Sequence, residues 1–513
     1  MGKRSLGILM AAALIVLAAC GGGGGSNQGN ASGPPKHGGS VTFGLRADFL
    51  SLDPLVINND SDLSVANGIY DTLTSRVGNK GDLGPGLADS WEPSTDLKTW
   101  TLHLHPGVQF HDGTPFNADA VVFNLQRHMD PRNKSMVLSD ALQIDSVKAV
   151  DDRTVAIALK SAWIDFPQIL VASIGLMASP TAVRQEGADY GKHPVGTGPF
   201  VFKEWVTGDH ITATRNRNYW RSGFPYLDSV TWRPIPDQDA KYASLKAGQI
   251  DVLQVATADQ VVKAGKDSKL KTWSYAGDGG TFVMMNTKVP PFDDLNARMA
   301  VTYATNRREI VDQIGRDKYP VATGPFPPGS DWDTKVAEPN YDVDKAKAAL
   351  QAYGKPLSFK FNIVSDPITR QYGQVLQAQW KKVGINADLV QMDQATLIQA
   401  AFGRQFQLQI FQYGDWFDPD RYLFNAYISK GSIVNFTGFA DPAVDTALIK
   451  GRTTSDPAAR KDAYGIVQQA IAREVPIVWL SYNTEYMISS TRVQNLNTIY
   501  SSITKPYQVW VSP

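Results

Sequence analysis

The hydrophobic and polar positions of the chain follow two periods, which together predict a mixed α/β fold. A two-residue alternation, typical of half-buried strands, runs through residues 40–45, 100–105 and 406–410. Helical spacing of apolar residues spans 118–129 and 368–383. From residue 359 onward strands and helices take turns, and this order indicates parallel pairing in an α/β domain.

Capping residues place the starts of several helices. Asn117 precedes one helix as an N-cap, and Asn306 with Glu309 three residues later resembles a capping box. Two late helices are each expected to begin at an aspartate followed by a proline, at Asp441-Pro442 and Asp456-Pro457.

Length and composition set the class of protein. The 513 residues suggest two to four domains. A helix is expected at residues 63–73. An apolar strand is expected at residues 476–482, after the last helices. Because it comes so late, we expect this strand to return to an earlier domain. The formal net charge of zero gives no reason to expect a nucleic-acid partner. The generous aromatic content, with 12 Trp, 19 Tyr and 21 Phe, fits either large cores or an aromatic-lined cleft.

The amino terminus predicts secretion and a lipid anchor. A short basic region is followed by an apolar run at 6–17, too short to span a bilayer as a mature helix. The next residues, LAAC at 17–20, resemble a bacterial lipobox, which implies a signal peptide at 1–19 and a lipid on Cys20. The alternative is an ordinary secretory signal with an incidental cysteine. The Gly-, Ser- and Pro-rich residues 20–37 cannot bury a core, so they predict a flexible tether.

A carboxylate stands where one predicted strand ends. The strand from Phe406 reaches Gly414, Asp415 follows at once, and Pro419 stops further ladder pairing. Open α/β sheets place ligands outside the carboxyl ends of their strands. An ionised aspartate among aromatic residues is costly unless it meets a cation, so we hypothesise that Asp415 meets the positive end of a ligand.

The same aspartates allow two other interpretations. Asp415, Asp418 and Asp420 are residues that commonly cap turns. Asp418 and Asp420 could also serve glycoside hydrolysis, but nothing in the sequence sets their separation. Neither a Gly-x-Ser-x-Gly elbow nor a His-Glu-x-x-His motif occurs in the chain, so we predict no catalytic residues.

Three histidines form the one cluster of metal-ligand side chains. His103 and His105 point to one face of a predicted strand, and His111 could fold back toward them to hold zinc or nickel. No nearby cysteine or obvious acidic ligand completes the set, so a solvated strand face is the preferred interpretation. We therefore predict no metal site and no cofactor.

Several motifs together resemble bacterial solute-binding protein family five, whose members are extracellular receptors of ABC importers. The matching pieces run in family order along the mature chain: Ser51-Leu52-Asp53-Pro54, residues 87–112 running into FHDGTPFNADAVVFNLQR at 110–127, VGTGPF at 195–200, MAVTYATNRREI at 299–310, LQAQWKKVGI at 376–385, and 414–422. The resemblance implies an α/β fold of two lobes that close like a flytrap over a ligand, with an extra α/β domain in the first lobe. The implied boundaries are lobe one at 38–73, 191–282 and 475–513, the extra domain at 74–190, and lobe two at 283–474.

The resemblance also implies ligand contacts. In peptide-binding members an aspartate at the position of Asp415 holds the α-ammonium group of the peptide, and Trp416 and Tyr413 would line the wall. The ligand carboxylate needs a cation, for which Arg370, Arg404 and Arg421 are candidates that match no family motif.

The implied function is a lipid-anchored receptor that delivers short peptides to a membrane permease. The ATPase would be a separate subunit because this chain has no Walker loop. We expect a monomer on the extracytoplasmic face of the membrane. The alternatives are a receptor for a non-peptide solute, such as a nickel complex or a sugar, and a role in signalling; a cell-envelope hydrolase is disfavoured.

Overall fold

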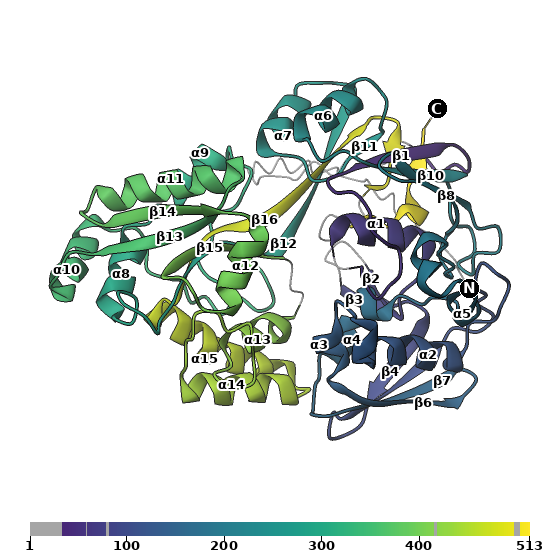
Figure 1. Ribbon diagram of the computed structural model, residues 1–513, viewed down its shortest axis with the longest axis horizontal. Helices are drawn as coiled ribbons and strands as arrows, with labels where there is room; N and C mark the ends of the chain where they lie inside the picture. Colours follow the sequence, from purple (N-terminus) through teal and green to yellow (C-terminus); the bar gives the residue numbers. More distant parts are fainter. Residues whose placement is uncertain (1–32, 58, 78–81, 415–417, 497–502, 513) are drawn as a thin grey trace, which may run out of the picture.

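The molecule has two halves that share one ten-stranded sheet (Figure 1). The computed structural model describes residues 33–57, 59–77, 82–414, 418–496 and 503–512. The strand order across the sheet is β14 (Asn386–Met392), β13 (Ser358–Val364), β15 (Leu408–Tyr413), β12 (Leu270–Met285), β16 (Ile477–Ser490), β11 (Val252–Leu253), β1 (Ser40–Leu45), β10 (Ser229–Pro234), β9 (His210–Arg215) and β8 (Phe200–Val206).

Two long antiparallel strands, β12 and β16, join the halves (Figure 1). Their pairing runs from Leu270 opposite Ser490 to Met284 opposite Ile477, with register shifts between Ala276 and Gly280 and between Thr281 and Phe282. At one end β16 pairs with β11, and at the other β12 pairs with β15. The sheet is therefore continuous, and its irregular middle lies where the halves meet.

The β15 half contains the parallel strands β13, β14 and β15 with helices on their faces. One core lies around Phe361, Leu376 and Trp380, and a second lies around Tyr427 and Tyr464. The helices of this half are α8 (Leu295–Tyr303), α9 (Arg307–Ile314), α10 (Val343–Tyr353), α11 (Pro367–Lys381), α12 (Gln394–Phe402), α13 (Asn425–Tyr427), α14 (Pro442–Thr453) and α15 (Pro457–Glu474).

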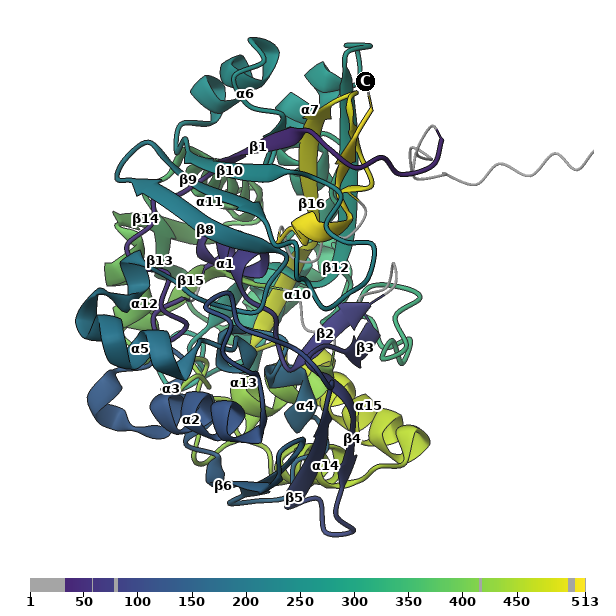
Figure 2. The same cartoon turned by 90° about the vertical axis from the view of Figure 1, so that its right-hand side faces the viewer.

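The β1 half combines the parallel strands β1, β10 and β11 with a separate four-stranded sheet. That smaller sheet has the order β4 (Ala88–Pro93), β5 (Thr99–Leu104), β7 (Thr154–Leu159) and β6 (Ile144–Asp151). It lies against α2 (Ala118–Met129) (Figure 2). The two pack around a core of their own, which includes Trp100, Val121 and Ile157. The other helices and strands of this half are α1 (Asp60–Ile69), β2 (Thr74–Val77), β3 (Asp82–Pro85), α3 (Leu138–Ala141), α4 (Phe166–Ile169), α5 (Pro180–Glu186), α6 (Gln238–Lys246), α7 (Ala258–Ala264), β17 (Val493–Gln494) and β18 (Trp510–Val511).

Most helix starts expected from the sequence are confirmed by their cap hydrogen bonds. The side chains of Asn117, Asp441 and Asp456 accept hydrogen bonds from backbone N–H groups in the first turns of α2, α14 and α15. The box at Asn306 is only half formed, because the backbone N–H of Asn306 donates to Gln379 rather than to Glu309.

Two expected segments were wrong in extent. The helix expected at 63–73 is α1, which starts three residues earlier and ends at Ile69. The strand expected at 476–482 is β16, which continues to Ser490, because it must cross both halves. The division into domains at the expected boundaries stays a prediction.

Cys20, the signal at 1–19 and most of the tether at 20–37 lie outside the described residues. Within the residues that the structure describes, no helix is both long and apolar enough to cross a membrane.

Candidate ligand-binding site

The carboxyl end of β15 lies directly against the strands that join the halves. Gly279 of β12 has φ +88°, and a Cβ at this position would come within 2.3 Å of the carbonyl oxygen of Gly414. Asn483 of β16 donates from Nδ2 to the carbonyl of Tyr413 at 2.7 Å. The end of β15 is thus fixed to the crossing strands, and the segment beyond Gly414 starts where the halves meet.

Tyr413 belongs to an aromatic group at this position. Its ring centroid lies 4.6 Å from that of Tyr422 and 4.9 Å from that of Phe282, and Phe282 in turn contacts Trp479. Burial raises the pKa of the Tyr413 phenol. The ring is therefore a neutral, partly exposed surface at the end of the strand, and its role as a wall residue stays a prediction.

Arg370 and Arg404, two of the cations proposed to bind a ligand carboxylate, lie at opposite edges of the sheet. Because β13 and β15 are parallel, their carboxyl ends share one edge of the sheet. Arg370 lies in the first turns of α11, just after β13, and donates from Nη2 to the carbonyl of Ser365, so it lies at the same edge as Tyr413. Arg404 lies before β15, and the ends of this six-residue strand are about 17 Å apart.

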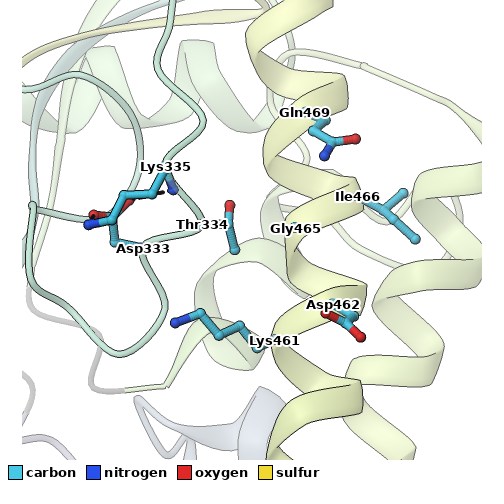
Figure 3. Close-up of a pocket in the computed structure, with 8 residues that line it drawn as sticks. All are labelled: Asp333, Thr334, Lys335, Lys461, Asp462, Gly465, Ile466 and Gln469. Carbon is cyan, nitrogen blue, oxygen red and sulfur yellow. Dashed lines mark hydrogen bonds and ion pairs between the residues drawn. The ribbon is translucent and has the colours of Figure 1, made fainter.

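Two hollows lie in the β15 half. Arg404 lines one of about 450 Å³ with Lys360, Asn362 and Gln407, at the amino end of β15. The other, of about 570 Å³, lies between the segment 333–335 and α15 (Figure 3). Neither hollow is lined by Tyr413 or Arg370. Asp415 and Trp416 lie outside the described residues, so their place at the edge stays a prediction.

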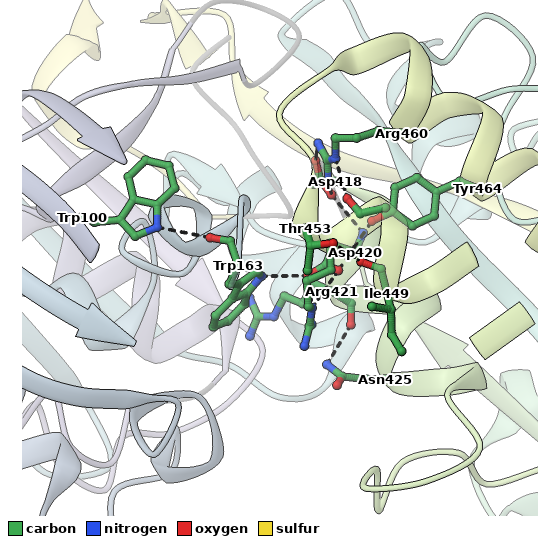
Figure 4. Close-up of polar contacts among 12 residues, drawn as sticks. Trp100, Trp163, Asp418, Asp420, Arg421, Asn425, Ile449, Thr453, Arg460 and Tyr464 are labelled. Carbon is green, nitrogen blue, oxygen red and sulfur yellow. Dashed lines mark hydrogen bonds and ion pairs between the residues drawn. The ribbon is translucent and has the colours of Figure 1, made fainter. Parts of the chain in front are cut away.

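Asp418 and Asp420 are buried members of ion pairs rather than a catalytic pair (Figure 4). Arg460 binds both oxygens of Asp418, at 2.6 and 2.8 Å, and Arg452 binds both oxygens of Asp420. Burial raises the pKa of Asp418, although Arg460 opposes this rise. Asp418 also caps its turn, because it accepts a hydrogen bond from the backbone N–H of Asp420. The prediction of a turn cap is therefore confirmed for Asp418, but it did not include the ion pair with Arg460.

Arg421, the third candidate cation, is engaged across the halves. Its Nη2 lies 3.3 Å from Asp140, in the unit built on the small sheet.

The three histidines have separate partners. His105 Nδ1 lies 2.8 Å from Asp89, His103 lies 3.7 Å from Glu92, and His111 Nε2 bonds the carbonyl of Gly198. Burial lowers the pKa of His111 to about 4. The described part of the chain contains no group of three His, Cys, Asp or Glu side chains arranged to hold a metal ion.

A charged cluster at the edge of the other half was missed by sequence reasoning. The carboxyl ends of β1, β10 and β11 meet there, and Arg46 pairs with Asp60 at 2.8 Å. Lys241 Nζ and one oxygen of Glu485 are buried without a hydrogen-bond partner among the described residues. Burial lowers the pKa of Lys241 to about 8 and raises that of Glu485 to about 7. No motif marks these residues, because the cluster forms only when β16 returns to β11.

Comparison with known proteins shows to which family this architecture belongs. The model of the bacterial extracellular solute-binding proteins, family 5, matches residues 82–434. The chain belongs to this family. It is 32% identical over 457 residues to the glutathione-binding protein GsiB of Pectobacterium atrosepticum, covering 86% of this chain and 88% of the relative. It is 30% identical to GsiB of Escherichia coli O157:H7, covering 88% and 90%.

Solved structures agree with the two-lobed fold. The Helicobacter pylori ABC transporter-associated periplasmic binding protein DppA, in complex with the peptide STSA, has a TM-score of 0.80 and 25% identity, covering 93% of this chain and 98% of that one. The substrate-binding protein CtaP of Listeria monocytogenes has a TM-score of 0.82 and 25% identity, covering 93% and 100%. As a member of this family, the protein is an extracytoplasmic solute-binding protein with two lobes. Its relatives are binding proteins of transporters.

Proposed function

We propose that the protein is a lipid-anchored, monomeric receptor of an ABC importer that binds short peptides between its lobes and delivers them to a membrane permease. The observation that carries this proposal is the similarity to glutathione-binding proteins over 86% of the chain. Glutathione is a tripeptide with a free amino group and free carboxylates. The neighbour DppA, solved with a peptide, supports the same ligand class.

The proposed contacts divide the ligand between its two charged ends. Asp415 binds the ammonium group, Trp416 and Tyr413 form the wall, and Arg370 binds a carboxylate. Arg370 is preferred over Arg404 because it shares the carboxyl edge of the sheet with Tyr413. It is also exposed, so a ligand can reach it. The lipid on Cys20 and the tether at 20–37 would hold the receptor near its permease.

Thermal unfolding of a soluble form that begins at residue 36 tests the proposal. Glutathione and pools of free peptides of two to five residues are added, each with an N-acetylated counterpart. A ligand at about 100 times its Kd stabilises a protein by about 2.7 kcal/mol, which gives a clear shift in Tm. We expect stabilisation by free ligands that acetylation abolishes, because acetylation removes the ammonium charge.

Variants locate the two ends of the ligand. Asp415→Asn and Arg370→Gln should each remove most of the shift, whereas Arg404→Gln, a matched change at the other edge of the sheet, should leave it intact. If no peptide and no glutathione shifts the Tm, the peptide receptor is refuted, and nickel complexes and sugars are tested next. A loss of the shift in Arg404→Gln alone would instead assign the carboxylate to Arg404.

A further inference from the structure

We infer that Trp163, through the ion pair of Asp420 and Arg452, holds the two halves together in the closed state and thereby sets ligand affinity without touching the ligand. This inference rests on the proposed function in one respect, that ligand binding closes the two lobes. Trp163 is a positioning residue in this account. It acts on the closed state rather than on the ligand.

Three polar contacts join the halves at one place, and Figure 4 shows the one between Trp163 and Asp420. The indole Nε1 of Trp163 donates to Asp420 Oδ2 at 2.7 Å. The backbone N–H of Ile164 donates to the carbonyl of Arg452 at 3.0 Å. The pair of Arg421 and Asp140 lies beside them at 3.3 Å. In each contact one partner belongs to the unit built on the small sheet and the other to the segment 420–452, where α3 and α4 face α13 and α14 (Figure 1).

Each side of the contact is held by its own half. Arg452 fixes Asp420 with hydrogen bonds of 2.9 Å to each oxygen, and its guanidinium lies 3.4 Å from the centre of the Phe424 ring. On the opposite side, Trp100 donates from its indole N–H to the carbonyl of Trp163, and the Trp163 ring packs against Phe166. The bond between Trp163 and Asp420 therefore joins two preset groups, and like the other two contacts it forms only when the halves meet.

Burial makes this bond strong. Trp163 is 5% exposed and Asp420 is fully buried. A hydrogen bond to a charged group contributes more than a neutral one, and it contributes more where water is excluded. Separation of the halves exposes both groups to water, so the bond favours the closed state. The affinity for the ligand follows the population of the closed state. Loss of the bond must therefore weaken ligand binding.

A neighbouring carboxyl couples the contact to pH. Asp165 is buried beside Asp418 and Asp420, and burial together with these two carboxylates raises the pKa of Asp165. The other charged or titratable groups around it are Arg452 on α14, Arg460 and Tyr464 on α15, and Arg76 on β2. The closed state holds a proton on Asp165 that the open state releases, so acidification favours closure and a rise in pH opposes it.

The decisive variant is Trp163→Phe, which keeps the ring packing and removes only the indole N–H. The ligand is glutathione, or the free peptide with the largest Tm shift. We expect its Kd, measured by calorimetry, to rise roughly tenfold. The rise should come mainly from faster dissociation of the ligand. The matched control is Trp220→Phe, which removes an indole bond of 2.8 Å to Asp71 within the β1 half. It should leave Kd unchanged. An unchanged Kd in Trp163→Phe, or an equal rise in both variants, overturns the inference.

Asp165→Asn gives a second test in the opposite direction. The amide needs no proton to enter the closed contact, so binding at pH 7.5 should be tighter than in the wild type. The ratio of the two Kd values should approach one as pH falls toward 5, and use of this ratio cancels the ionisation of the ligand. A ratio that does not change with pH contradicts the coupling.

Failure of the proposed function is distinguishable from failure of this inference. If no compound stabilises the wild type, the peptide receptor fails, and small-angle scattering of the unliganded wild type, Trp163→Phe and Asp165→Asn at pH 5.5 decides the contact. We expect Trp163→Phe to be the most expanded of the three. Superimposable scattering curves would refute the contact between the halves.

Discussion

Glu485 lies in β16 with one carboxylate oxygen buried and without a hydrogen-bond partner among the described residues. Burial, and to a lesser degree the charge of Asp60, raises the pKa of Glu485 to about 7 from its ordinary value of 4.5. A raised pKa means that the folded state keeps a proton that the unfolded chain releases. This residue therefore costs stability when it is ionised.

The sign of the pH dependence follows from this proton. Between about pH 4.5 and pH 7 the contribution of Glu485 to the free energy of unfolding should fall as pH rises, by at most on the order of 3 kcal/mol, and should then be constant. Urea unfolding of the wild type and Glu485→Gln at several pH values measures it as the difference between the two proteins.

Glu92, whose side chain is 71% exposed, provides the control. Glu92→Gln is the same substitution at an exposed carboxyl, so it shows what the change from Glu to Gln does without burial. Parallel profiles for the wild type and Glu485→Gln would contradict the assignment of the raised pKa to this carboxyl.

At the scale of single elements, helix caps decide where the helices of the β15 half start. Asp456 accepts a hydrogen bond from the N–H of Ala458 at 3.0 Å, and Pro457 occupies the first turn. The helix that follows, α15, buries Tyr464, Val467 and Ile471 in a core that it shares with α14. The start of the helix and the packing of its apolar face are thus set together.

Asp456→Ala should lower the free energy of unfolding by about 1 kcal/mol, because the first turn loses its side-chain acceptor. Chemical denaturation measures the change. Asp462→Ala, at an exposed position inside the same helix, should be neutral or slightly stabilising because alanine has the higher helix propensity. Equal destabilisation by both substitutions would argue against a role of the cap.

At the scale of the whole molecule, the halves meet at a place where backbone packs on backbone. Gly279 has positive φ, and its Cα faces the carbonyls of Tyr413 and Gly414, so no side chain fits between β12 and the end of β15. The same contact fixes the strand end from which the candidate ammonium site begins. We therefore predict that stability and ligand binding are coupled at this residue.

Gly279→Ala should destabilise the fold and reduce the Tm shift given by glutathione or peptides. Gly329→Ala is the matched control, since Gly329 has φ +92° but no atom within 4 Å of an added Cβ. Strain from positive φ alone costs about 1–2 kcal/mol, and Gly279→Ala should exceed the cost of Gly329→Ala because the backbone of β15 must also move. Equal costs for the two variants would exclude the close approach as the cause.

The sequence by itself determined the class of fold, most helix starts and the family. These depend on local patterns: the period of apolar residues, an aspartate before a proline, and motifs of fixed spacing such as 110–127. It also indicated that a candidate carboxylate follows the strand that ends at Tyr413, because a strand and its end are local features.

Only the tertiary structure decided which distant charges meet. Asp418 and Asp420 look like turn residues in the sequence, but their partners, Arg460 and Arg452, lie more than thirty residues away, and Trp163 approaches Asp420 from the other half. Arg370 and Arg404 look alike in the sequence, and parallel pairing of β13 with β15 places them at opposite edges. Ion pairs, strand order and closure depend on contacts between segments far apart in the chain, for which residue spacing carries no signal.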